Sequence, residues 1–170
     1  MRMIECGCTC QLAKQRKQNM RLYTPLLVPP APWQDISMDF VLGLPKTNKQ
    51  HDSILVVVDR LSKMTHFIPC SKTFDASHVA RIFMERIVSL HSVPKTIVSD
   101  RVVKCTSYFW KTMWKVLGTR LQFTYAYHPQ TDGQTEVVNR SLGNLLRCLV
   151  GKHVRSWESV LPIAEFAYNS

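Results

Sequence analysis

Three apolar segments between residues 35 and 70 constrain the fold most, because they are close enough in sequence to pair as an antiparallel meander. Residues 35–42 alternate, which predicts a strand with one apolar face. Residues 54–58 are uniformly apolar, which is typical of a strand buried on both faces. Residues 65–70 are expected to form the third strand. In the first strand, one face carries Ile36, Met38, Phe40 and Leu42, and the other carries Asp35, Ser37, Asp39 and Val41.

The remainder of the chain alternates helical and strand patterns, which predicts a mixed five-stranded sheet flanked by helices. The expected helices are 75–91, capped by Asp75, then 107–117, ended by Gly118, then 134–150, and a last one capped by Ser156. The expected strands are 96–99 and 120–125. The core-facing stripes of the first three helices are expected to be Val79, Ile82, Phe83, Ile87 and Leu90; Phe109, Trp110, Met113, Trp114 and Leu117; and Val138, Leu142, Leu145 and Leu149.

The chain is strongly basic, with a net charge of +10 over 170 residues and a pI near 9.6. Such a balance favours a polyanionic partner, nucleic acid first and an anionic membrane second. A basic protein without such a partner is the alternative. No apolar run reaches the roughly 18 residues of a membrane span, and no secretory signal is expected in residues 1–20.

Three carboxylates stand at positions that suit a metal site. Asp39 lies within a strand, Asp100 follows one, and Glu136 is near the start of a helix. Carboxylates converging from such elements form a hard-oxygen site for Mg²⁺ or Mn²⁺. Each also has a structural interpretation, as a solvent-facing strand residue, a turn former and a helix cap. Asp59 competes by position, but a structural role paired with Arg60 or Lys63 is favoured.

The stretch from residue 125 to 140 joins a polar loop to a helix. Thr131 and Gln134 have capping-box spacing. His128 is interpreted as a substrate contact or a loop-shaping residue, because a two-metal site needs no histidine base. One helix face is expected to carry Glu136, Arg140, Gly143 and Arg147, which suits either a phosphate backbone or ordinary solvation.

Four stretches together resemble the integrase of retroviruses and LTR retrotransposons, most closely the gypsy class found in plant genomes. They are Pro32–Phe40, Val56–Lys63, Ile97–Arg101 and Tyr127–Glu136, the last being the most specific. Asp100 and Glu136 are separated by 35 residues, which matches the family's Asp, Asp, 35 residues, Glu pattern.

The resemblance implies a ribonuclease-H-like fold, Mg²⁺ (or Mn²⁺) dependence, and processing of DNA 3′ ends followed by strand transfer. It assigns catalysis and metal binding to Asp39, Asp100 and Glu136. It also implies DNA partners (element ends and target), a homo-oligomer when active, no membrane partner, and action in the nucleus or otherwise in a cytoplasmic particle. DNA contacts are expected from His128, Gln134, Asn139, Arg140 and Arg147.

The chain also departs from the family pattern. Residues 1–24 are expected to be the remnant of a zinc module with its linker, in which Cys10 persists but no complete zinc site remains. Residues 25–170 are expected to be a catalytic core truncated at its C-terminal side. Val102 to Cys105 replace an Asp-x-Lys-Phe pattern. A decayed, non-catalytic DNA-binding remnant is therefore the main alternative, and another ribonuclease-H-like nuclease or transposase is a third.

Overall fold

The computed structural model describes residues 29–99, 107–123, 129–151 and 153–170, without the side chains of 129–134. Its five strands are β1 (Asp35–Val41), β2 (Ser53–Asp59), β3 (Thr65–Cys70), β4 (Thr96–Ser99) and β5 (Arg120–Phe123). They form one sheet in the order β3-β2-β1-β4-β5. The first three strands pair antiparallel, whereas β4 and β5 run parallel to β1. The predicted meander and mixed five-stranded sheet are confirmed.

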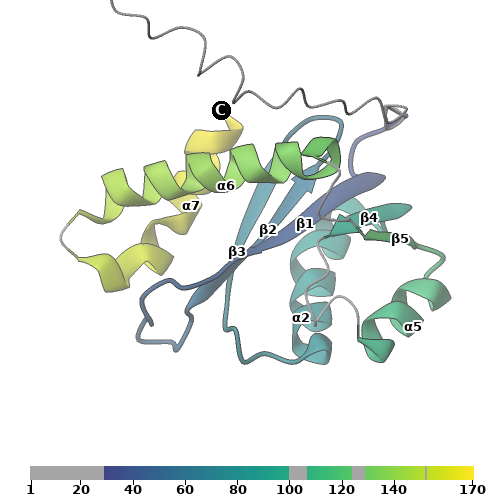
Figure 1. Cartoon of the computed structure of the whole chain (residues 1–170), viewed down its shortest axis with the longest axis horizontal. Helices are drawn as coiled ribbons and strands as arrows, with labels where there is room; N and C mark the ends of the chain where they lie inside the picture. The colour runs from purple at the N-terminus through teal and green to yellow at the C-terminus, as the bar shows by residue number, and fades with distance from the viewer. Residues whose placement is uncertain (1–28, 100–106, 124–128, 152) are drawn as a thin grey trace, which may run out of the picture.

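Helices cover both faces of this sheet. Figure 1 shows α6 (Pro129–Val150) and α7 (Trp157–Asn169) on one side, with α2 (Ala76–Phe83) and α5 (Tyr108–Val116) on the other. Two apolar clusters fill the two interfaces. The strand β2 is buried at every position, as its uniformly apolar sequence predicts. Among the described residues, no helix combines the length and apolarity that a bilayer crossing requires.

The alternation of β1 sorts its side chains between these two interfaces. Ile36, Met38 and Phe40 belong to the cluster that contains the tryptophans of α5. Val41, on the opposite face, packs against the cluster built with α6 and α7. Asp39 has the same parity as Val41, so it lies on the face that α6 covers. This parity is what brings a strand carboxylate close to a helix far away in sequence.

The first predicted helix is interrupted by a change of winding. Asp75 caps α2 by accepting a hydrogen bond from the His78 backbone, as predicted. A π-helical segment, η1 (Met84–Val88), then leads into α3 (Ser89–His91). Because a π turn holds more residues than an α turn, it rotates the residues that follow. Leu90 is consequently 66% exposed, so its prediction as a core residue is wrong.

Two other helices bury somewhat different residues from those predicted. In α5 the core is filled by Trp110 and Trp114, one turn apart, while Phe109 and Leu117 are largely exposed. In α6 the fully buried stripe runs at intervals of four residues, so that Leu146 takes the place predicted for Leu149. The buried positions of that stripe are Val138, Leu142 and Leu146, with Leu145 partly buried.

Of two further predicted helix starts, one differs and one is found where it was expected. The helix α6 begins at Pro129, a residue whose fixed backbone angle suits the first helical position. The backbones of Thr131 and Gln134 therefore lie inside the helix and not at its start. The helix α7 begins directly after Ser156 as predicted, and a 3₁₀ turn, η2 (Val154–Ser156), precedes it. The Ser156 hydroxyl donates to the His153 carbonyl at 2.7 Å and makes no capping bond.

Candidate active site

The carboxylate of Asp39 sits in the middle of the sheet, where β1 passes under α6. The residue is partly buried and pairs across the sheet with Val56 of β2. One carboxylate oxygen accepts a 2.7 Å hydrogen bond from the Phe40 backbone amide. The other accepts a 2.7 Å hydrogen bond from the side-chain amide of Asn139. The position of the carboxylate is thus fixed by both its own strand and α6.

Asn139 brings the acidic start of α6 toward this strand. It lies three residues after Glu136, which corresponds to an axial rise of about 4.5 Å along an α-helix. Its Nδ2 must face Asp39 because a carboxylate only accepts hydrogen bonds. Its Oδ1 is buried without a hydrogen-bond partner in the described part of the chain. A buried acceptor next to a carboxylate is a position where an ordered water or an ion's water shell fits.

Glu136 itself points to solvent. It is 68% exposed and accepts a 2.9 Å ion-pair hydrogen bond from Arg140, which is 72% exposed. The structure therefore places Glu136 within one helical turn of the residue that touches Asp39, but does not bring the two carboxylates into contact. An exposed pair at this helical spacing contributes only about 0.3–0.5 kcal/mol, so the Glu136 carboxylate is easily released from Arg140.

Asp100 lies outside the described residues, but the strand that precedes it is well defined. In the parallel pairing of β1 and β4, Ser99 stands opposite Met38. The residues that immediately precede Asp100 and Asp39 are therefore register partners in adjacent strands.

The donor chemistry of the described residues fits a hard divalent cation in part. Asp39 supplies a carboxylate held by two hydrogen bonds, and Glu136 supplies a second that is weakly engaged. Oxygen ligands of this kind are preferred by Mg²⁺ and Mn²⁺. Within the ranges described, no three His, Cys, Asp or Glu side chains are grouped to hold a metal ion. The third predicted ligand, Asp100, lies outside these ranges.

Asp59 has the structural role predicted for it, although its partners differ from those expected. It is fully buried and accepts hydrogen bonds from the Trp33, Leu61 and Ser62 backbone amides. Burial raises the pKa of this carboxyl, but the hydrogen bonds from Ser62, Trp33 and Leu61 together outweigh it and hold the pKa below its ordinary value. No ion pair with Arg60 or Lys63 forms among the described residues.

The proposed DNA-facing side of α6 is exposed as the helical spacing predicts. Arg140 and Arg147 are both exposed, and Gly143 between them leaves open space around its backbone. Asn139 was predicted as a DNA contact, and its bond to Asp39 had no sequence signal beyond its three-residue spacing from Glu136. His128 lies outside the described residues, and so does the side chain of Gln134. Cys10 and the whole of 1–24 are also outside them.

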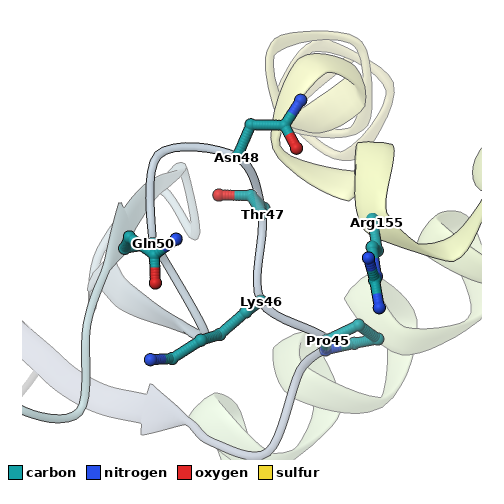
Figure 2. A pocket seen from close by; sticks show the side chains of 6 residues that line it. All are labelled: Pro45, Lys46, Thr47, Asn48, Gln50 and Arg155. Carbon is teal, nitrogen blue, oxygen red and sulfur yellow. The ribbon is translucent and has the colours of Figure 1, made fainter.

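A separate polar hollow lies at the other end of α6, between the β1–β2 connection and η2. Its lining comprises Pro45, Lys46, Thr47, Asn48, Gln50 and Arg155. Figure 2 shows Lys46 and Arg155 extending on opposite sides of the 45–50 loop. The nearby Lys49 is already paired with Glu158 at 3.0 Å. Two cations that diverge in this way do not enclose a single anion, so the candidate site remains the one around Asp39.

Sequence comparison identifies curated relatives of this chain. It is 38% identical over 165 residues to the Transposon Tf2-3 polyprotein of Schizosaccharomyces pombe, a match that covers 95% of the chain. The chain is homologous to a segment of Tf2 retrotransposon polyproteins. That segment is 12% of the relative's length, so the chain spans a small part of the polyprotein. No protein-family model matches the chain.

Comparison with solved structures identifies the fold of this chain. A chain of the simian T-cell lymphotropic virus intasome superposes with a TM-score of 0.69 at 17% identity, covering 84% of this chain and 50% of that one. The HTLV-2 integrase catalytic core domain, solved in complex with magnesium, gives 0.63 at 16% identity and covers 81% and 86%. The segment therefore has the ribonuclease-H-like fold of integrase catalytic cores. Its assignment to a gypsy-class, plant-like element stays a prediction.

Proposed function

We propose that this segment is an integrase catalytic core that processes DNA 3′ ends and joins them to target DNA. The observation that carries the proposal is the Asn139–Asp39 hydrogen bond of 2.7 Å. It docks the acidic first half of α6 on the strand that holds the first carboxylate. Homology to a retrotransposon polyprotein and the integrase-core fold support the same function.

The metal would be held by Asp39, Asp100 and Glu136, with Asp39 shared between two ions. Divalent ions, when bound, supply activation of the attacking oxygen and stabilisation of the leaving oxygen at a phosphodiester. The residues of the chain have positioning roles. Asn139 fixes the orientation of Asp39, and the Phe40 amide holds its second oxygen. Both bonds already order the Asp39 side chain, so less conformational entropy is lost when it binds an ion.

The Glu136–Arg140 ion pair is proposed to separate when DNA and metal bind, with each residue taking a new partner. The Glu136 carboxylate would leave Arg140 and turn toward Asp39, because their exposed pair is weak. Arg140 would then be free to contact a phosphate, with Arg147 two turns further along the same face. The basic net charge of +10 supports a polyanion along this face.

The partners in this proposal are the ends of the element and the target DNA. Joining two ends calls for more than one subunit, so the active form would be a homo-oligomer. The reaction would take place on chromosomal DNA in the nucleus, and the protein would otherwise reside in a cytoplasmic particle. These assignments belong to the proposal for a whole polyprotein of the kind that this chain matches over 12% of its length.

Strand joining by purified protein on a branched DNA substrate with Mn²⁺ tests the proposal. Wild type should give metal-dependent product, and Glu136→Gln should lower the rate at least about 100-fold, because a lost ion contact costs several kcal/mol in the transition state. Glu85→Gln is the matched control, an exposed glutamate in η1 on the other face of the sheet. Equal product from wild type and Glu136→Gln would refute the assigned site.

The same assay separates the alternative. A protein that binds DNA with a steep salt dependence, yet joins no strands with either Mg²⁺ or Mn²⁺, would be the non-catalytic remnant. The replacement of the family pattern at 102–105 is the sequence feature that favours this outcome. Restoring an Asp-x-Lys-Phe sequence there should recover strand joining if only that stretch of sequence is defective.

A further inference from the structure

Trp33 is held in an unusual backbone conformation at the start of β1. Its φ angle is +61°, a region that residues other than glycine rarely occupy. Its amide donates a 3.0 Å hydrogen bond to the Asp59 carboxylate. Its indole stacks on the His91 imidazole with a 3.7 Å centroid separation and a 5° angle between the planes. A backbone conformation of this kind persists when its surroundings hold it in place.

His91 is in turn the first member of a hydrogen-bonded chain that crosses three elements. Its Nε2 lies 2.8 Å from Nε2 of His66 in β3. The other ring nitrogen of His66, Nδ1, lies 2.9 Å from the Glu165 carboxylate of α7. The second oxygen of Glu165 accepts a 2.8 Å hydrogen bond from the Phe67 amide. This chain is separate from the Asp39 site and shares no residue with it.

The chemistry of these groups fixes where the hydrogens are. A carboxylate only accepts, so Nδ1 of His66 carries a hydrogen. In a neutral His66 the Nε2 is therefore an acceptor, and His91 must donate from its own Nε2. One added proton is tolerated, because His91 can switch tautomer and accept from a charged His66. Two added protons are not tolerated, because both Nε2 atoms would then carry hydrogens at a separation of 2.8 Å.

We propose that His66, His91 and Glu165 form a proton-operated latch that fixes Trp33 and the end of α3 against the sheet, and that the latch opens when both imidazoles are protonated. His66 is retained by Glu165 on opening, so His91 is the ring that moves. A charged His91 gains a cation–π attraction to Trp33. A charged His66 nevertheless repels it, because the two Nε2 atoms lie 2.8 Å apart and would both carry hydrogens with no acceptor between them.

The surrounding charges agree with an opening below neutral pH. Burial and the charge of His66 lower the pKa of His91, and the charge of Asp59 only partly opposes them. Burial raises the pKa of Glu165. The hydrogen bonds from His66 and Phe67, together with the charges of His66 and Arg86 in η1, outweigh burial and hold the pKa below its ordinary value. Glu165 therefore stays ionised over the range in which His91 takes up its proton.

Nitrogen-detected or long-range ¹H–¹⁵N NMR of the imidazole rings, recorded from pH 8 to pH 5, tests the latch. At pH 8, His66 should be the Nδ1–H tautomer and His91 the Nε2–H tautomer. The Trp33 amide and indole signals should shift with the same midpoint as His91. The singly protonated latch is closed and needs only one further proton to open, so in that regime each pH unit below the midpoint should lower the ratio of closed to open latch about tenfold.

His91→Phe keeps an aromatic ring against Trp33 but removes the proton, so the Trp33 transition should disappear. His78→Phe is the matched control, because His78 packs on another aromatic residue, Phe74, outside the chain of hydrogen bonds. Trp33 signals that do not change between pH 8 and pH 5, or that titrate equally in His91→Phe, would overturn the proposal. If His91→Phe does not fold, the wild-type tautomers and shared midpoint decide the question.

Discussion

Asn139 of α6 donates a 2.7 Å hydrogen bond to the carboxylate of Asp39 in β1, across 100 residues of sequence. Hydrogen bonds to a charged acceptor contribute more than neutral ones, and a partly buried carboxylate depends on them. The bond links the two elements from which the proposed metal ligands come. It makes the geometry of the site dependent on how α6 is seated on the sheet.

Asn139→Ala should reduce stability and activity together. Loss of the bond leaves the Asp39 carboxylate short of one donor, which costs about 1.5–3 kcal/mol in the free energy of unfolding. Urea denaturation measures this change, and the strand-joining rate measures the effect on the site. Asn144→Ala, an exposed position on the same helix, should change neither quantity appreciably. Similar stability for both variants would show that the Asn139 bond does not stabilise the fold.

Arg140→Gln and Arg147→Gln should weaken DNA binding without unfolding the chain. Each phosphate contact that is lost should reduce the slope of log K against log salt by about 0.7–0.9. Both side chains are exposed, so the free energy of unfolding should change by no more than about 0.5 kcal/mol. The control is Lys115→Gln on α5, which removes the same charge from the opposite side of the sheet. An equal change of slope in the control would indicate nonspecific attraction by net charge alone.

Asp59→Asn should make the chain less stable at neutral pH and less sensitive to acid. The folded-state pKa of Asp59 lies below its unfolded value, so its contribution is present above about pH 3.9 and is lost as the pH falls through the folded pKa. The variant has no carboxylate at this position and so lacks this pH-dependent contribution to stability. Its stability should therefore fall less steeply than that of wild type below about pH 4, as followed by circular dichroism in urea at several pH values. Parallel profiles would contradict the buried, charged state of Asp59.

Leu142→Ala and Leu149→Ala distinguish the observed face of α6 from the one expected from sequence. Leu142 is fully buried, and truncating it should cost about 2–5 kcal/mol in the free energy of unfolding. Leu149 is 39% exposed and should cost about 1 kcal/mol or less. Thermal or urea denaturation measures both. Comparable losses at the two positions would mean that α6 is rotated relative to the sheet.

The antiparallel meander and the mixed sheet flanked by helices follow from local patterns, and for that reason they were predictable. Alternation in 35–42 and the uniform run in 54–58 encode which faces of β1 and β2 are buried. The exposure of Leu90 was not predictable, because a π-helical turn leaves no periodic signature in composition. The start of α6 at Pro129 was missed because capping residues further along the chain suggested a later start.

The candidate site was predictable as a set of residue types but not as a set of contacts. Asp39 could be placed from strand parity, and Glu136 from its position in a helix. The Asn139–Asp39 bond depends on how a helix packs on a strand 100 residues away, and no local pattern encodes that. The same holds for Asp59, where backbone amides replaced the expected cations as partners.

Calorimetric titration of the purified chain with Mn²⁺ tests most directly whether β1 and α6 contribute ligands to one metal site. Wild type should bind Mn²⁺, and Asp39→Asn and Glu136→Gln should each weaken that binding at least about tenfold, because each removes a carboxylate ligand. Glu85→Gln should bind as wild type does. Unchanged Mn²⁺ affinity in both Asp39→Asn and Glu136→Gln would contradict the account.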